Sequence, residues 1–456
     1  MNHKWLPCLL LLAATAVSQA QAPADRASAL AAEAGAINDT AALERAARTA
    51  VRIGDSEAAI AAWKRLTEMR PHLGRYKLEL AAAYAAQDDK SASYNALLEL
   101  QAQGYAFDIG QDPRFAKVAT TEAWKFIVQG LDANRAPFGE GEVAWTLPAQ
   151  DLLIDALAWD PTGKQLLVGS ARSGAVYAVG RGGQLRPLVQ ADADNGMWAV
   201  FDLAVDAGRG VLWVASTAVP HFRGYDPEQD LGRAGVFRFD LRSGRFVERF
   251  LSPSIPGQSF FISSLALAPD GTVYAADGVN NAVYSVGKEG FRRLFHAPSM
   301  TSIRGMAVSG DGGTLYFADH ELGILGFDLA SGKPFDVRVP RNLALGGIDG
   351  MEWWQGHLIV VQNRMQPSRV MRLQLSSDGR SIAGVVPLEA NKPALTFPTA
   401  STLAGDSLYL IANSPKRHYD RFGALKTGDA PEATRIYRLQ ADFEGAQPKS
   451  VTTPIR

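Results

Sequence analysis

Acidic side chains recur at one position of a repeated strand pattern in the second half of the chain. Asp155, Asp202 and Asp349 each stand near the start of an apolar run, 10 to 12 residues before a large side chain of the following run. Carboxylates that converge from separate segments can hold a hard cation or transfer a proton. The alternative for each one alone is a turn or cap residue that binds backbone N–H groups. A buried group of three acids would need a cation, or Arg304, to balance its charge.

The elements that must position these acids repeat with a period in the forties. Six phrases read as strand, tight turn and strand, and their turn glycines are 45, 63, 41, 44 and 49 residues apart: Gly163, Gly208, Gly271, Gly312, Gly356 and Gly405. Third and fourth β runs follow, and four strands per unit predict an all-β six-bladed β-propeller over residues 142–445. The sixth unit lacks its fourth run, which "EVAWTLP" at 142–148 is expected to supply, closing the ring.

In such a ring the first run of every unit faces a central channel. The channel-facing positions are Asp155, Asp202, Ser263, Arg304, Asp349 and Thr399. Asp277, Asp319, Asn363 and Asn413 recur at the ends of the second runs. Repetition of this kind predicts structural turn bonding, although Asn363 and Asn413 are also placed to reach the channel mouth.

Residues 25–130 have a different pattern, alanine-rich with apolar positions at helical spacing. Ala59, Trp63, Leu66 and Pro71 are separated by 4, 3 and 5 residues, which resembles the second helix of a tetratricopeptide repeat. The pattern predicts a small all-α tetratricopeptide-like domain, with a plain helical hairpin bundle as the alternative. Helical repeats offer concave surfaces, so a protein partner is expected to bind through them.

Composition and the N-terminus limit the class of protein. The chain has 46 basic and 47 acidic residues, a balance that does not favour nucleic acid or an anionic membrane surface. Residues 1–20 have a basic start at Lys4, an apolar run and a small-residue exit, which predict a cleaved signal peptide and a periplasmic or secreted protein. No run is long enough for a membrane span. Cys8, the only cysteine, lies in this segment, so no disulfide or thiol nucleophile is expected in the mature protein.

The propeller phrases resemble the regucalcin and gluconolactonase family. The resemblance covers about residues 142 to 440 and rests on "LAPDGTVYAAD" and "GIDGMEWWQGHLIVVQN". Exported bacterial proteins that join a tetratricopeptide-like front to such a propeller share "LWVAST" and "GYDPEQDLGRAGVFRFDLRSG" with it. The resemblance implies a divalent cation, usually calcium, at one channel mouth, with a lactone or ester substrate beside it.

The family's site maps onto this sequence with two changes. Asp155 matches the metal glutamate of the first blade but is one methylene shorter, and Asp349 matches the metal aspartate of the fifth. The family has an asparagine where this chain has Arg304, which cannot ligate a cation and would grip an anionic substrate or pair with a carboxylate. Asp202 is expected as an extra ligand or general base. His221, in the longest insertion, is a candidate proton-transfer group, with a surface or packing role as the alternative.

Two functions from different classes are consistent with the sequence. The first is an exported gluconolactonase-like hydrolase of lactones or related esters, assisted by a divalent cation. It assigns catalytic roles to Asp202, Arg304 and His221, and metal ligation to Asp155, Asp349 and Asn363. The alternative is a non-catalytic periplasmic scaffold or binding protein, in which the Asp–Arg cluster is an internal ion-pair network. The sequence has no GxSxG, HExxH or P-loop motif, which disfavours serine-hydrolase, zincin and nucleotide chemistry.

Overall fold

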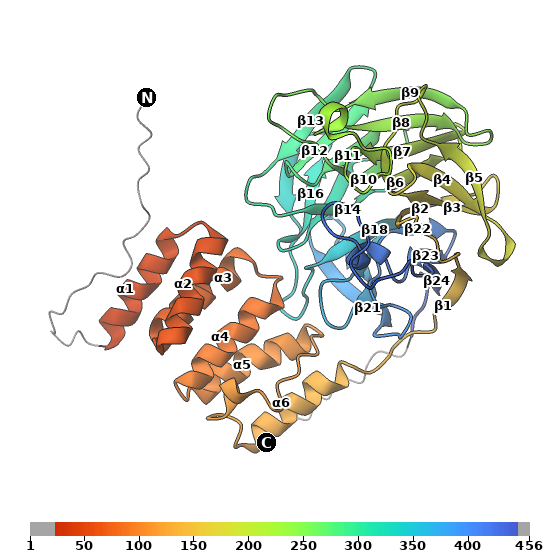
Figure 1. Cartoon of the computed structure of the whole chain (residues 1–456). Helices are drawn as coiled ribbons and strands as arrows, with labels where there is room; N and C mark the ends of the chain where they lie inside the picture. Colours follow the sequence, from red (N-terminus) through yellow and green to blue (C-terminus); the bar gives the residue numbers. More distant parts are fainter. Residues whose placement is uncertain (1–22, 446–456) are drawn as a thin grey trace, which may run out of the picture. The chain divides into compact units, whose positions relative to one another are not determined.

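The computed structural model describes residues 23–445 of the chain (Figure 1). They belong to two compact units that divide between Met69 and Arg70. The helices that follow Arg70 therefore belong to the same unit as the propeller. The predicted signal peptide, residues 1–20, lies outside the described residues. No helix between residues 23 and 445 combines the length and apolar composition needed to cross a membrane.

Between residues 23 and 69 the first unit contains three helices. They are α1 (Pro23–Ala36), α2 (Thr40–Ile53) and α3 (Ser56–Met69). Helix α2 begins where the side chain of Asp39 accepts a hydrogen bond from the N–H of Ala41 at 2.8 Å, and it ends at Gly54, whose φ of 77° suits only a residue without Cβ. Ala59 and Trp63 of α3 are both buried, as their helical spacing predicts.

Three further helices open the second unit. They are α4 (Gly74–Ala86), α5 (Lys90–Ala102) and α6 (Glu122–Ala133), with a short 3₁₀ turn, η1 (Pro113–Phe115), before the last. Their shared core includes Leu97, Phe115 and Trp124, and it extends to Ala344 and Met365 from loops of the propeller. These helices thus pack against the propeller through a continuous apolar core.

The remaining chain forms six antiparallel four-stranded sheets, so the predicted six-bladed propeller is confirmed. From the inner strand outward, blade 1 consists of β2 (Ile154–Asp160), β3 (Gln165–Ser170), β4 (Ala175–Val179) and β5 (Leu185–Gln190). Blade 2 consists of β6 (Ala199–Asp206), β7 (Val211–Thr217), β8 (Ala234–Asp240) and β9 (Phe246–Leu251). Blade 3 consists of β10 (Ile262–Leu267), β11 (Val273–Asp277), β12 (Ala282–Gly287) and β13 (Gly290–His296).

Blades 4 to 6 follow the same order. Blade 4 consists of β14 (Ile303–Val308), β15 (Thr314–Asp319), β16 (Gly323–Asp328) and β17 (Lys333–Asp336). Blade 5 consists of β18 (Ile348–Trp354), β19 (His357–Gln362), β20 (Arg369–Leu375) and β21 (Ile382–Ala390). Blade 6 consists of β22 (Ser401–Ala404), β23 (Ser407–Ile411), β24 (Arg435–Gln440) and β1 (Glu142–Thr146). Short helical turns interrupt three connections: η2 (Arg181–Gly183), α7 (Pro227–Asp230) and η3 (Pro415–His418).

The ring closes through a strand from the start of the propeller. Strand β1 pairs antiparallel with β24, with Glu142 opposite Arg438, and Figure 1 shows the gold β1 beside the blue β24. Tyr437 Oη donates a hydrogen bond to the carbonyl of Gly141 at 2.6 Å. The expected closure by residues 142–148 is confirmed, and it covers the sheet edges that an open ring would expose.

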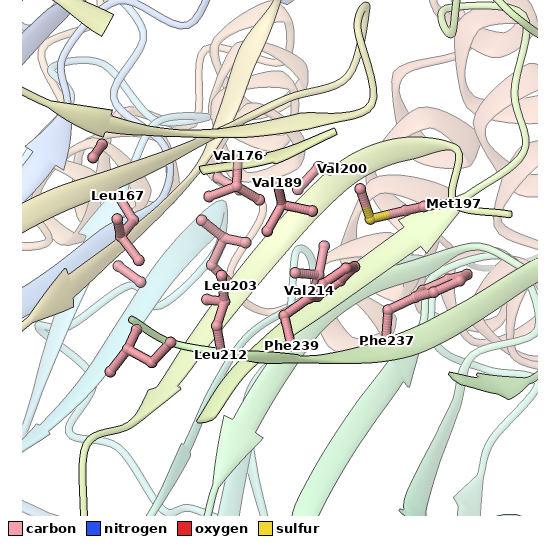
Figure 2. Packing of buried hydrophobic residues seen from close by; sticks show 14 of the residues in the cluster. Leu167, Val176, Val189, Met197, Val200, Leu203, Leu212, Val214, Phe237 and Phe239 are labelled. Carbon is pink, nitrogen blue, oxygen red and sulfur yellow. The ribbon is translucent and has the colours of Figure 1, made fainter. Parts of the chain in front are cut away.

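Side chains from facing sheets fill the space between blades. Between blades 1 and 2, Val176 packs with Val200, Val214 and Phe237 (Figure 2), and all four are fully buried. Alternate residues of each strand point into this gap. In the sequence these residues are apolar positions of the β runs. Because Phe237 is fully buried, its truncation to alanine would lower the free energy of unfolding by about 3–5 kcal/mol. Packing of this density keeps the inner strands, and the residues they carry, in fixed positions.

Candidate functional site

The inner strands of the six blades surround a central cavity of about 590 Å³. The six residues expected from the sequence all line it: Asp155, Asp202, Ser263, Arg304, Asp349 and Thr399. Glu352 and Lys416, which the sequence pattern did not single out, line it as well. The channel wall therefore combines carboxyl groups with two cationic side chains, which is the composition of a polar binding or reaction site rather than of a packed core.

A break in strand pairing turns two of the acids toward the channel. In β2 the pairing with β3 skips Asp155, and in β18 the pairing with β19 skips Asp349. A residue skipped in this way forms a β-bulge and is re-aimed out of the ladder. In β6 the skipped residue is Phe201. Asp202 therefore stands one position further along its strand than Asp155, not at the equivalent position expected from the repeat.

The offset gives Asp202 a different environment. Its Oδ1 accepts a hydrogen bond from the N–H of Leu203 at 2.8 Å, and its Oδ2 accepts one from the N–H of Leu265 at 2.7 Å. The carboxyl group thus ties blade 2 to blade 3. Burial raises the pKa of Asp202 to about 7, against the effect of the two N–H donors. Both oxygens are engaged, which suits a structural link between blades.

Asp155 forms an ion pair with a residue from the last blade. Lys416 Nζ lies 2.6 Å from Asp155 Oδ2, and the carboxyl group is 3% exposed while the lysine side chain is 34% exposed. Asp155 Oδ1 is buried and has no hydrogen-bond partner among the described residues. Burial raises the pKa of Asp155 even though Lys416 lies beside it. Asp155 thus has a raised pKa, and its Oδ1 atom is left without a hydrogen-bond partner among the described residues.

Lys416 is carried by η3 in the long connection between β23 and β24. The connection is anchored by Tyr419, whose hydroxyl donates to Asp151 Oδ1 at 2.6 Å. Asp151 also binds Arg172 and Arg223, each at 3.0 Å. Arg172 in turn donates to the carbonyl of Gly423 at 2.9 Å. This network fixes the connection against blade 1 and so fixes Lys416 at the channel mouth.

Asp349 is held by two side chains from other segments. Its Oδ1 lies 3.1 Å from Nε2 of His320, and its Oδ2 accepts a hydrogen bond from the side-chain amide of Asn363. Burial acts to raise the pKa of Asp349, but the hydrogen bond and charge of His320, with the charges of Arg304 and Lys416, hold it well below its usual range. Asp349 is therefore a permanently ionised group at neutral pH.

Arg304 enters the same cavity without a carboxylate partner. Among residues 23–445, no ion pair joins its guanidinium to Asp155 or Asp349, so the direct pairing considered from the sequence is not formed. The guanidinium carbon lies 5.4 Å from the centre of the Phe261 ring, and Nε is buried without a hydrogen bond to any described residue. A guanidinium held in this way offers its N–H groups to an anion or a polarised carbonyl.

Two more groups bear on the site. Glu352 lies further along β18, where its Oε1 accepts a hydrogen bond from Ser401 at 3.0 Å, and burial raises its pKa to about 8. His221 lies in the insertion of blade 2, with its ring centre 6.5 Å from that of Tyr419. Burial lowers the pKa of His221, and the charge of Lys416 adds to this effect. His221 thus stands beside the connection that carries Lys416 and is neutral at pH 7.

The acids at the ends of the second strands have the structural role expected. Asp277 accepts hydrogen bonds from the N–H groups of Phe261 and Val279. Asp319 accepts from Thr301 and Glu321 in the same way. These carboxylates fix the loops that lead to the channel mouth.

The mouth is also the expected place of a divalent cation. Three oxygens there lack a partner within the described part of the chain: Asp155 Oδ1, Asn363 Oδ1 and Thr399 Oγ1. However, Lys416 occupies the other oxygen of Asp155, and no group of three or more His, Cys, Asp and Glu residues between 23 and 445 is arranged to hold a metal ion. Lys416 and Arg304 already balance the charges of Asp155 and Asp349. The residues in this arrangement do not fit a divalent cation as well.

No model of a protein family matches the chain, and no curated protein matches it. Three solved structures are similar to the chain. A gluconolactonase from Xanthomonas campestris is 17% identical, with 68% of this chain and 92% of that chain covered and a TM-score of 0.45. A PQQ-bound aldose sugar dehydrogenase from Streptomyces coelicolor is 17% identical (67% of this chain, 99% of that chain, TM-score 0.44), and a virginiamycin B lyase from Staphylococcus aureus is 14% identical (66% of this chain, 99% of that chain, TM-score 0.41). Structural neighbours thus include a gluconolactonase. At this level of similarity no activity of these proteins is transferred to the chain.

Proposed function

We propose that the chain is a hydrolase of lactones or related esters that acts at the mouth of the propeller channel. The observation that carries the proposal is the grouping of Asp155, Lys416 and Arg304 on one cavity. Together they offer a basic carboxylate, a cation that orients it and a second cation without a carboxylate partner. These are the groups that addition of water to a carbonyl requires.

Asp155 is the general base in this proposal. Its Oδ2 is fixed by Lys416 at 2.6 Å, and its unpaired Oδ1 is the atom that would accept a proton from water. Burial raises the pKa of this carboxyl group, and a carboxylate with a raised pKa is a stronger base than one in water. Asp349 is unsuited to this role because its pKa is depressed. It would instead balance the charge of Arg304.

Arg304 stabilises the negative charge that develops on the carbonyl oxygen. Water adds to the carbonyl carbon as its proton passes to Asp155 Oδ1, and the former carbonyl oxygen becomes an oxyanion beside the guanidinium. Collapse of this intermediate breaks the bond between the carbon and the ring oxygen. The proton on Asp155 then passes to that leaving oxygen, so a lactone and one water give one hydroxy acid. Loss of an oxyanion donor typically lowers kcat by about 10²–10³-fold.

Hydrolysis of a panel of γ- and δ-lactones and aryl esters, measured with the purified protein, tests this proposal. We expect Asp155→Asn to abolish turnover and Arg304→Gln to lower kcat/KM by about 10²-fold. Arg292→Ala, an exposed residue of β13, is the matched control and should keep wild-type rates. Turnover that survives in Asp155→Asn, or absence of activity on the whole panel, would rule the proposal out.

A metal-assisted form of the same reaction is the second candidate. It is favoured by the three unpaired oxygens of Asp155, Asn363 and Thr399, and it requires Lys416 to leave Asp155. Calcium titration followed by calorimetry distinguishes the two forms, because only the metal-assisted form predicts binding that is lost in Asp349→Asn.

The segment before the helices supports export. The basic start, apolar run and small-residue exit of residues 1–20 are the basis of this part of the proposal. N-terminal sequencing of the protein recovered from a periplasmic extract tests it. We expect the chain to begin at Gln21, and a protein that keeps Met1 in that fraction would contradict cleavage.

A further inference from the structure

A second cavity lies outside the channel, between the first turn of α4 and loops of blades 4 and 5. Its volume is about 710 Å³. The lining includes His72, Arg75, Tyr105, Phe107 and Arg364. His320 also lines it, and the same ring contacts Asp349 of the channel. The two cavities are therefore neighbours, because His320 lines the second and contacts Asp349, which lines the first.

Hydrogen-bond donors gather at one end of this cavity. Helix α4 begins there, at Gly74, whose N–H donates a hydrogen bond to the hydroxyl of Tyr105 at 3.1 Å. The partial positive charge of a helix N-terminus favours an anion nearby. His72 adds an independent donor. It is 8% exposed, and its Nδ1 accepts a hydrogen bond from the N–H of Leu345 at 3.3 Å. The ring proton is therefore on Nε2, and no acceptor for that proton is found among residues 23–445.

The buried His72 is a neutral donor at physiological pH, because burial lowers its pKa to about 4. The nearby acid Glu321 is neutralised by Arg70, whose Nε lies 2.8 Å from its carboxylate. Arg364 is exposed and makes no ion pair with any described residue. The cavity thus has an excess of positive charge and of N–H donors. A planar guanidinium such as that of Arg364 matches a carboxylate in a two-point interaction.

Aromatic surface forms the other part of the cavity. The rings of Tyr105 and Phe107 are stacked, with centres 5.1 Å apart and planes 8° apart. Tyr105 is fixed because its hydroxyl donates to the carbonyl of His72 and accepts from the N–H of Gly74, both at 3.1 Å. Phe107 is only partly buried. A flat apolar group could stack on it while an attached anion meets the donors.

We propose that this cavity binds a small carboxylate with a planar apolar body, at a site separate from the channel. The carboxylate meets Arg364 and the N–H of His72 near the start of α4, and the planar body packs on Phe107. His320 lines this site and contacts Asp349 of the channel, so the occupant lies one ring away from Asp349. The proposal does not depend on the hydrolase function, because it concerns binding alone.

Calorimetric titration of the full chain with benzoate, at pH 7 and low salt, tests the proposal. We expect saturable binding of one benzoate by the wild type. Arg364→Ala should weaken it by about tenfold or more, since it removes a charge-assisted contact, and Phe107→Ala should weaken benzoate more than acetate. Arg186→Ala, an exposed arginine of β5, is the matched control and should bind as the wild type does.

Arg304→Ala separates this cavity from the channel, where benzoate could also meet a guanidinium. Benzoate binding that is kept in Arg304→Ala and weakened in Arg364→Ala supports the proposal. Binding lost in Arg304→Ala but kept in Arg364→Ala overturns it, as does the absence of saturable binding to the wild type. Inorganic phosphate is the second probe, and phosphate that binds more tightly than benzoate in an Arg364-dependent manner would refute the carboxylate class.

Discussion

The ammonium group of Lys416 lies 2.6 Å from the carboxylate of Asp155 at the channel mouth. The two residues come from opposite ends of the propeller sequence, since Asp155 lies on the first blade and Lys416 on the connection before the last paired strand, β24. The ammonium group of Lys416 thus pairs with the carboxylate of Asp155, which the resemblance to gluconolactonases assigned to a metal ion. This contact and the charge of Arg304 together balance the carboxylates of the mouth.

Removal of Lys416 is expected to destabilise the protein in a pH-dependent way. In Lys416→Met the buried carboxylate of Asp155 loses its partner, and the free energy of unfolding should fall by about 1–2 kcal/mol at pH 8, a modest value because the lysine is partly exposed. The deficit should shrink as the pH falls and Asp155 takes up a proton, since a neutral carboxyl group does not need the ammonium. Urea unfolding at several pH values measures this. The double variant Asp155→Asn/Lys416→Met should recover part of the loss, and a deficit that is constant with pH would contradict the explanation.

Calcium is expected to leave the wild type unchanged and to bind once Lys416 is removed. The wild-type mouth already balances its two carboxylates with two cations, whereas Lys416→Ala leaves an excess of negative charge and frees Asp155 Oδ2. The measurement is the thermal midpoint with and without about 5 mM calcium, a concentration above the dissociation constants of roughly 0.1–1 mM of weak calcium sites. Stabilisation of the wild type by calcium, absent in Asp349→Asn, would favour the metal-assisted form instead.

The pair of Asp349 and His320 should contribute to stability at neutral pH and lose that contribution in acid. The folded pKa of Asp349 is depressed, so its contribution is present above the pKa of an unfolded aspartate, about 3.9, and is lost as the pH falls through the lower folded value. Asp349→Asn should lower the free energy of unfolding by about 1–3 kcal/mol at pH 7, and less in acid. In a double-mutant cycle with His320→Gln, additive effects would show that the two side chains do not interact.

Glu352 should make the protein less stable as the pH rises. Its folded pKa is raised to about 8, so between the unfolded value, about 4.3, and pH 8 the folded state holds a proton that the unfolded state has lost. Stability therefore falls across this interval, with a slope below about 1.4 kcal/mol per pH unit because the cavity gives the group some access to water. Glu352→Gln should remove that slope and be the more stable protein at pH 9. Parallel pH profiles for the two proteins would contradict the raised pKa.

The fold was largely predictable because propeller strands carry their pattern locally. Six strand–turn–strand phrases located the blades, and the unit without a fourth run indicated the closing strand at 142–148. The fourth run of blade 4 was less regular. The run "FDVRV" begins at 335, whereas β17 is Lys333–Asp336, because Arg338 leaves the sheet and bridges to Ser381 of the next blade.

The site was only partly predictable. Asp155 and Asp349 could be placed by counting from the second strand, but the count for Asp202, 11 residues, falls between their values of 12 and 10. Such a count cannot resolve a one-residue bulge, which the strand pairing reveals. Lys416 and His320 come from loops, where residues far apart in sequence meet only after folding. The one available signal was the long segment between "SLYLI" and "RIYRL", a place where among the other blades only blade 2 has a long insertion.

The closing contact between β1 and β24 has a consequence for how the protein is made. The hydrogen bond from Tyr437 to Gly141 joins residues 296 positions apart, and Lys416 reaches Asp155 across a similar stretch. A ribosome must therefore have released almost the whole propeller before the ring can shut or the channel mouth can assemble. Until then the growing polypeptide is an open row of blades, without the finished site and with free sheet edges that a chaperone could still engage.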